Sequence, residues 1–288
     1  DWLLSKGKGI LGKKLGIVEK DASALILDHL QVCYDVCHFA IGYEKPKETF
    51  QKLKKAGIGI GKIQLSAALK LLIPGSTNER FSIGKRLEEF ADTTYLHQVV
   101  ARTQGKELIS YPDLPQAITQ LNTTEDLEWR VHFHLPLHAA PGAPFGDTRD
   151  HLLGALDWMQ AHPAACQHAE METYTWEVLP PALRVGIEDQ LVSEYDWTLA
   201  ALAERTGGIG GLVNNAGVPS GAGAAPLLDM DDAMWNDTVA VNLTGVYLVT
   251  KWVGRAMRDR DQGGSIINIS STAGRRGLPD YGAYCATK

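Results

Sequence analysis

The chain has 288 residues, of which 44% are hydrophobic and 22% are charged, and its formal net charge is −6. This length is enough for one large domain or two smaller ones, each with a hydrophobic core. The negative charge argues against nucleic-acid binding, and no apolar run approaches the roughly 18 residues of a membrane helix. The cysteines include no Cys-x-x-Cys pair, so we expect reduced thiols and a cytoplasmic protein.

The first 200 residues alternate between strand-like and helix-like stretches. Helices are expected at 48–56 and 187–204, and apolar, β-branched runs predict strands at 30–37, 58–65, 95–101, 129–137 and 171–176. Alternation of this kind favours an α/β fold with a parallel sheet or barrel.

The composition changes near residue 200, where a glycine cluster occupies 206–211. A dinucleotide-binding loop follows a strand, whereas this cluster precedes one, so it predicts a turn. Beyond it we expect a helical stretch at 231–260, broken near 242–245, and a buried strand at 265–269. The chain is therefore expected to divide between 199 and 207, into domains at 1–200 and 205–288.

Three residues near the C-terminus have the chemistry of carbonyl and alcohol redox sites. Tyr284 and Lys288 are four residues apart, so on a helix they lie on one face. An ammonium beside a phenol favours the phenolate, which suits the phenol for proton transfer. Ser271, thirteen residues before Tyr284, can place a substrate oxygen against the phenol.

With these motifs, residues 205–288 resemble the middle portion of a short-chain dehydrogenase/reductase. The family's N-N-A-G motif is matched by Asn214-Asn215-Ala216-Gly217, and its four catalytic positions are matched by Asn242, Ser271, Tyr284 and Lys288. The resemblance implies a partial Rossmann-like doubly wound parallel sheet and an NAD(P)-dependent oxidoreductase with a small-molecule carbonyl or alcohol substrate.

The same resemblance implies a role for each matched residue. Tyr284 exchanges the proton, Ser271 anchors the substrate, Asn242 supports a water relay, and Lys288 contacts the ribose of NAD or NADP. The remaining cofactor-binding positions are Asn214, Ala216 and Gly217. The family's T-G-x-x-x-G-I-G loop is absent and Lys288 is the last residue, so we expect a truncated, inactive segment.

Acidic and histidine side chains in the first 200 residues form a second candidate site. Asp35 and His38 are three residues apart at a predicted strand end, while His132 and His134 alternate on another predicted strand. Glu170 and Glu172 alternate in the same way. Such groups can converge on Mn²⁺, Mg²⁺ or Zn²⁺, although ordinary hydrogen-bonded histidines are the commoner outcome.

Residues 1–200 resemble the C-terminal part of the ebo-cluster metabolite-traffic protein, a relative of xylose-isomerase-like sugar phosphate isomerases/epimerases. The similarity lies in the segments 33–44, 59–69, 95–102, 130–137 and 171–180. It implies a partial (β/α)8 barrel whose metal ligands are Asp35, His38, His134 and Glu172. An incomplete barrel has open sheet edges, so self-association is expected.

Three functional hypotheses remain open from the sequence. The first is a short-chain oxidoreductase, and the second is a metal-dependent isomerase or epimerase. The third is a non-catalytic composite of two gene fragments.

Overall fold

The computed structural model describes residues 3–172, 175–218, 224–259 and 263–288. The chain divides into two compact units, Asp1–Leu183 and Arg184–Lys288. The division lies earlier than the expected boundary between 199 and 207, because the helix α8 (Ile187–Thr206) belongs to the second unit. Among the described residues, no helix is both long and apolar enough to cross a membrane.

In the first unit a π-helical turn (Leu3–Gly7) and two short helices, α1 (Lys8–Leu15) and α2 (Glu19–His29), precede a small parallel sheet. The sheet has the order β1-β2-β8, with bounds Val32–Asp35, Ile60–Leu65 and Ala169–Met171. The strand expected at 30–37 is shorter, because Asp35 caps the helix α3 (Val36–Ile41) by accepting a hydrogen bond from the Cys37 N–H.

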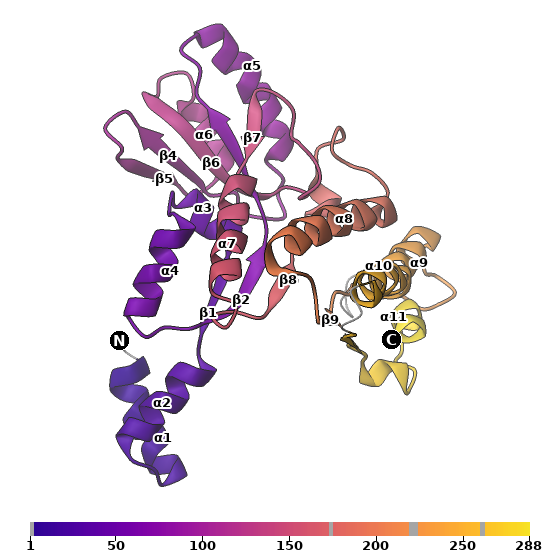
Figure 1. Ribbon diagram of the computed structural model, residues 1–288. Coiled ribbons are helices and arrows are strands. Elements are labelled where there is room, and N and C mark those ends of the chain that lie inside the picture. The colour runs from indigo at the N-terminus through magenta and orange to yellow at the C-terminus, as the bar shows by residue number, and fades with distance from the viewer. Residues whose placement is uncertain (1–2, 173–174, 219–223, 260–262) are drawn as a thin grey trace. The chain divides into compact units, whose positions relative to one another are not determined.

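Aromatic side chains pack between this sheet and the helices α4 (Pro46–Lys55) and α7 (Arg149–Ala161), which contact each other (Figure 1). The ring of Phe50 lies 4.4 Å, centroid to centroid, from both Tyr34 and Trp158. The buried Tyr34 hydroxyl and the His151 Nε2 are hydrogen bonded at 2.8 Å. These contacts fix β1 and therefore the position of Asp35 at its end.

The other sheet of the first unit is antiparallel at every pairing, with the order β5-β4-β6-β3-β7. These strands span Leu108–Tyr111, Val99–Thr103, Asp126–His134, Ala68–Leu72 and Phe145–Asp147. The expectation of a partial (β/α)8 barrel is wrong for these strands, since a barrel of that kind is wholly parallel. Residues 104–107, which join β4 to β5, are too few for the crossover of about a dozen residues that parallel strands need.

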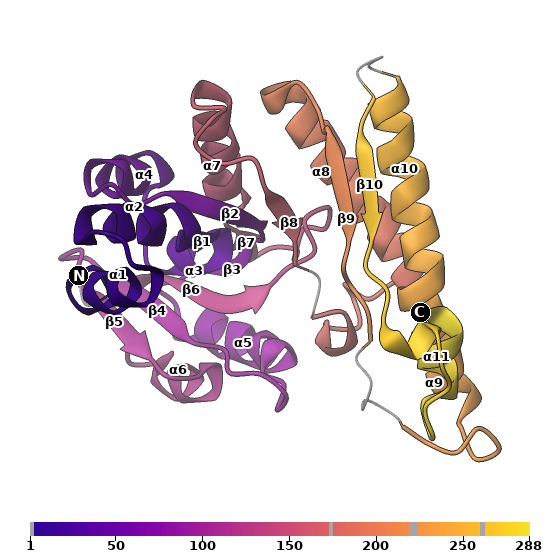
Figure 2. The same ribbon diagram turned by 90° about the horizontal axis from the view of Figure 1, so that it is seen from below.

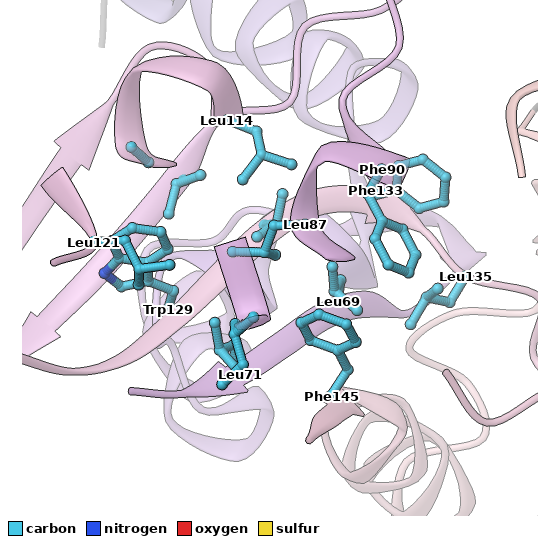
Figure 3. Packing of buried hydrophobic residues seen from close by; sticks show 14 of the residues in the cluster. Leu69, Leu71, Leu87, Phe90, Leu114, Leu121, Trp129, Phe133, Leu135 and Phe145 are labelled. Atoms are coloured by element: carbon cyan, nitrogen blue, oxygen red, sulfur yellow. The ribbon is translucent and has the colours of Figure 1, made fainter. Parts of the chain in front are cut away.

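The main hydrophobic core lies against this antiparallel sheet, under the helices α5 (Thr77–Leu87) and α6 (Leu114–Gln120) (Figure 3). Trp129 and Phe133 of β6 are fully buried in it, and the Trp129 indole N–H donates to Asp126 Oδ2 at 2.8 Å. Burial of each such side chain contributes about 1.5–3 kcal/mol. The core therefore holds β6, whose last residue is His134, in a fixed register.

Two further expected strands of the first unit differ from the structure. The strand expected at 95–101 begins only at Val99, because the preceding His97 N–H is bonded to Asp113 Oδ1 rather than to a neighbouring strand. Of the strand expected at 171–176, Met171 lies in β8, whereas Thr173 and Tyr174 lie outside the described residues and Trp176–Val178 form a 3-10 turn.

The second unit contains a β-α-β arrangement (Figure 2). β9 (Gly211–Asn214) and β10 (Ser265–Asn268) run parallel, with Leu212 opposite Ile266. The strand expected at 265–269 is present at Ser265–Asn268, but the expectation that it is buried is wrong, because all four of its residues are exposed. Within the described part of this unit, these two are the strands of its sheet. Gly207, at φ 73°, ends α8 before β9, so the prediction of a glycine turn is confirmed.

Between β9 and β10 the chain forms one long, interrupted helical stretch, as expected. Its parts are α9 (Asp232–Val239), a π-helical segment (Ala240–Gly245) and α10 (Val246–Arg258); Arg260 lies outside the described residues. Val253 and neighbouring side chains of α10 pack against Leu212 and α8. The last helix, α11 (Gly282–Thr287), contacts α9 and the π-helical segment.

Candidate functional site

The tyrosine and lysine of the second unit lie together at α11. The Lys288 Nζ is 5.8 Å from the centre of the Tyr284 ring, and both side chains are half-buried. Ser271 begins the 3-10 turn Thr272–Gly274, where its hydroxyl oxygen accepts the Ala273 N–H at 3.2 Å. That bond leaves the hydroxyl hydrogen of Ser271 available to an oxygen acceptor.

Asn242 connects three segments around this helix. Its buried side chain accepts the Val218 N–H at 2.7 Å through Oδ1 and donates through Nδ2 to Thr287 Oγ1 at 3.1 Å. The π-helical segment supplies this position, and single π-turns inside helices occur frequently at functional sites. Asn242 thus ties the chain after β9 to α11, one residue before Lys288.

Gly217 allows the lysine to approach the backbone. A Cβ at this position would lie 2.8 Å from Lys288 Nζ, closer than real Cβ contacts, and 3.1 Å from Asn242 Oδ1, which is a tight contact. The Lys288 ammonium is therefore held between the Gly217 backbone and Tyr284. The structure thus brings Asn242, Gly217, Tyr284 and Lys288 into one neighbourhood.

The other residues of the N-N-A-G motif have different surroundings. The Asn214 amide donates to Thr250 Oγ1 at 2.9 Å and to Asn268 Oδ1 at 2.7 Å, so it joins β9, α10 and β10. Ala216 is exposed. Asn214 therefore positions the strand ends, while the exposed backbone of Ala216 and Gly217 is accessible to a ligand.

Three of the four residues expected to bind metal converge in the first unit. Asp35, His134 and Glu172 offer ligand atoms that all lie within 4.8 Å of one another, and we call them the carboxylate group. The His134 ring lies between the two acids, with Nε2 4.0 Å from Asp35 Oδ2 and Nδ1 3.7 Å from Glu172 Oε2. Ser66 Oγ donates to Asp35 Oδ1 at 2.7 Å and orients that carboxylate.

Burial dominates the electrostatics of the carboxylate group. It raises the pKa of Glu172 to about 7, helped by the negative charges of Asp35 and Glu170 and opposed by Lys62. Burial also lowers the pKa of His134 to about 4. At neutral pH His134 is therefore a neutral imidazole, the form that binds metal ions.

The fourth expected ligand, His38, does not join this set. Its Nε2 is 3.4 Å from Asp35 Oδ2, but its side chain is 55% exposed and its ring packs on His132 at 4.2 Å between centroids. A second set, Cys37, His132 and His134, also has all ligand atoms within 4.8 Å of one another, and we call it the thiol group. In the sequence, the alternation of His132 and His134 indicates that these two members of the thiol group lie on the same face of β6.

The family model of short chain dehydrogenases matches residues 182–288. Among curated proteins, 2-(S)-hydroxypropyl-CoM dehydrogenase 3 of Xanthobacter autotrophicus is 45% identical over 109 residues, which are 37% of this chain and 41% of that protein. Sorbitol dehydrogenase of Cereibacter sphaeroides is 36% identical over 112 residues, covering 39% and 43%. L-xylulose reductase of Bos taurus is 37% identical over 106 residues, covering 36% and 41%.

The chain thus spans less than half the length of these relatives. Among solved structures, a short-chain alcohol dehydrogenase from Sinorhizobium meliloti is 30% identical with a TM-score of 0.35, covering 47% of this chain and 56% of that one. An NAD⁺-bound xylitol dehydrogenase is 25% identical with a TM-score of 0.34, covering 49% and 46%. Scores this low support no argument about the fold.

The expected resemblance of the C-terminal part to short-chain dehydrogenases is confirmed for residues 182–288 by the family match.

Proposed function

We propose that residues 184–288 contain the acid/base site of an NAD(P)-dependent oxidoreductase that interconverts an alcohol and a carbonyl compound. The observation behind this proposal is the Lys288 ammonium, which lies between the Tyr284 ring and the Gly217 backbone. The names of the matched relatives, which include a sorbitol dehydrogenase and an L-xylulose reductase, favour a small hydroxylated or keto substrate.

Each side chain has a defined part in the proposed reaction. The Tyr284 hydroxyl, with the Lys288 ammonium 5.8 Å from its ring centre, gives a proton to the carbonyl oxygen during reduction and takes it back during oxidation. The Ser271 hydroxyl donates to the same substrate oxygen and orients it. Asn242 holds α11 and the chain at Val218 in register through its two hydrogen bonds.

The residues around Gly217 fit a nicotinamide nucleotide. The exposed backbone of Ala216 and Gly217 lies beside the Lys288 ammonium, which can donate to a ribose hydroxyl. The bound nucleotide would supply or accept the hydride. Its pyrophosphate is normally held by a glycine-rich loop between a strand and a helix, and no T-G-x-x-x-G-I-G sequence occurs in the 288 residues.

The missing loop has a consequence for cofactor binding by this chain. With Lys288 and Gly217 in place but no pyrophosphate loop, we expect the 288-residue chain to bind NADP(H) more weakly than micromolar. Calorimetric titration measures this directly. Micromolar affinity would show that other residues of the chain hold the pyrophosphate.

The catalytic assignment is tested in a chimera in which residues 184–288 replace the matching segment of the sorbitol dehydrogenase. We expect the folded chimera to oxidise sorbitol, and Tyr284→Phe to reduce its turnover by about 100-fold or more. Tyr281→Phe, three residues earlier, is the matched control and should retain activity. A folded but inactive chimera, or equal losses in the two variants, would contradict the assignment.

The carboxylate group supports a second candidate function, a metal-dependent isomerase or epimerase activity of residues 1–183. Glu172 Oε2 is buried without a hydrogen-bond partner among the described residues, and it lies beside the neutral His134 imidazole. Asp35, His134 and Glu172 could hold Mn²⁺ or Mg²⁺, which prefer oxygen ligands and would polarise a substrate carbonyl. We expect Mn²⁺ binding that Glu172→Gln weakens at least ~10-fold, and Mn²⁺ binding unaffected by this change would exclude the site.

A further inference from the structure

The thiol group combines three donors that the proposed functions leave unused or use only in part. Cys37 is fully buried in the first turn of α3, and His132 and His134 alternate on β6. The three ligand atoms lie within 4.8 Å of one another. His132 Nε2 is buried and has no hydrogen-bond partner in the described parts of the chain.

The backbone around each donor is fixed. The Cys37 N–H donates to Asp35 Oδ1 at 3.0 Å and to Ser66 Oγ at 2.9 Å. The His132 N–H donates to the Gln98 carbonyl at 2.8 Å, and the His134 carbonyl accepts from Thr175 Oγ1 at 2.6 Å. Donors on rigid elements are what a metal site requires, because the ligand geometry must be held within about 0.5 Å.

The donor chemistry distinguishes this group from the carboxylate group. One sulfur and two imidazole nitrogens suit Zn²⁺, which binds Cys and His at about 2.0–2.3 Å and accepts three protein ligands with a fourth position for water. Mn²⁺ and Mg²⁺ prefer the oxygen atoms of Asp35 and Glu172.

We propose that Cys37, His132 and His134 form a zinc site with an open fourth position. This site is independent of the oxidoreductase proposal for residues 184–288. It shares His134 with the carboxylate group.

The test uses the full chain, freed of metal with a chelator and titrated with Co²⁺ as a spectroscopic substitute for Zn²⁺. A thiolate ligand gives a sulfur-to-cobalt charge-transfer band in the near ultraviolet, together with intense visible bands of tetrahedral cobalt. We expect the charge-transfer band and the visible bands in the wild type, and we expect added Zn²⁺ to displace Co²⁺ and remove them. Absence of the charge-transfer band in the folded protein would overturn the proposal.

Four variants locate the ion. Cys37→Ser should abolish the charge-transfer band, and both Cys37→Ser and His132→Gln should weaken Zn²⁺ binding at least ~10-fold in competition with a chromophoric chelator. Cys33→Ser, an exposed cysteine outside the group, should leave band and affinity unchanged. Glu172→Gln should weaken Mn²⁺ but not Zn²⁺.

Zn²⁺ binding in the His132→Gln and Glu172→Gln variants distinguishes the thiol group from the carboxylate group. Zn²⁺ affinity that falls in Glu172→Gln but persists in folded His132→Gln would place the ion on the carboxylate group and overturn the thiol site. Because Cys37 is fully buried, the fold of Cys37→Ser is checked by circular dichroism. His132→Gln, at a partly exposed position, remains decisive if Cys37→Ser unfolds.

Discussion

Asn242 and Thr287 are joined by a 3.1 Å hydrogen bond between buried side chains that are far apart in sequence. The bond links the π-helical segment to the last turn of α11, and the Thr287 hydroxyl in turn donates to the Tyr284 carbonyl at 3.1 Å. Because Tyr284 lies on this helix and Lys288 directly follows it, the position of both depends on the asparagine. A helix as short as Gly282–Thr287 has little stability of its own in water.

Asn242→Ala should therefore destabilise the second unit by about 1–3 kcal/mol, because it leaves the partly buried Val218 N–H without its acceptor and the buried Thr287 hydroxyl without its donor. Amide hydrogen exchange of residues 184–288 measures this loss separately from the first unit. Asn236→Ala, at an exposed position of α9, is the matched control and should change stability by less than about 0.5 kcal/mol. Equal effects would mean that the Asn242 bonds contribute nothing.

Gly217→Ala should separate catalysis from stability. The added methyl would displace the flexible end of Lys288 from Tyr284, and a shift of about 1 Å at a reacting group can cost about 100-fold in rate. In the sorbitol dehydrogenase chimera we expect such a loss of turnover at nearly unchanged thermal stability. Gly277→Ala, which has open space at the Cβ, should keep full turnover, and full turnover in Gly217→Ala would argue against the position assigned to Lys288.

Gly264→Ala should weaken the packing of α10 on the β9–β10 pair. A Cβ there would lie 2.5 Å from the Met257 Sδ and 3.0 Å from the Gly210 carbonyl, and Met257 is buried in the small core of this unit. Overpacking of this kind costs about 1–3 kcal/mol. Urea unfolding followed by hydrogen exchange tests it against Gly210→Ala, whose Cβ meets nothing within 4 Å. A stable Gly264→Ala variant would show that Met257 can rearrange freely.

The second unit was the more predictable part, because its signals are local. The spacing of Tyr284 and Lys288 predicts that they lie close together, and the structure places Tyr284 on α11 with Lys288 directly after it. The break expected at 242–245 lies in the π-helical segment. The partners of Asn242, which are Val218 and Thr287, could not be predicted. They depend on how separate segments meet in space.

The first unit was less predictable, because its strand pairings are long-range. Short strands such as β3 and β7 have no strong periodic pattern, and their antiparallel pairing overturned the barrel expectation for that sheet. Spacing indicates Asp35 with His38 and Glu170 with Glu172 as candidate groups, and it is the resemblance that joins Asp35 to Glu172 in one ligand set. Cys37 was overlooked because a single buried cysteine resembles an ordinary core residue, and only the fold places it beside His132.

The buried pair of Tyr34 and His151 leads to a prediction about pH. Burial lowers the pKa of His151 to about 4, and the positive charge of Arg130 acts in the same direction, against Asp150 and Glu44. In the unfolded chain this histidine has its ordinary pKa of 6.5, so between pH 6.5 and pH 4 it is protonated there while His151 of the folded chain is still neutral. Stability from this group is therefore complete above pH 6.5 and is lost as the pH falls toward 4.

His151→Gln keeps a polar partner for the Tyr34 hydroxyl but does not titrate, so it isolates this contribution. Between pH 7 and pH 4 the wild type should lose on the order of 3 kcal/mol more stability than His151→Gln. Urea unfolding of both proteins across this range, without added metal, gives the difference directly and cancels the titration of the other histidines. If the free energies of unfolding of the two proteins change in parallel with pH, the folded protein accepts a proton on His151 with little loss of stability. The Tyr34 hydroxyl would then not need the imidazole lone pair as its acceptor.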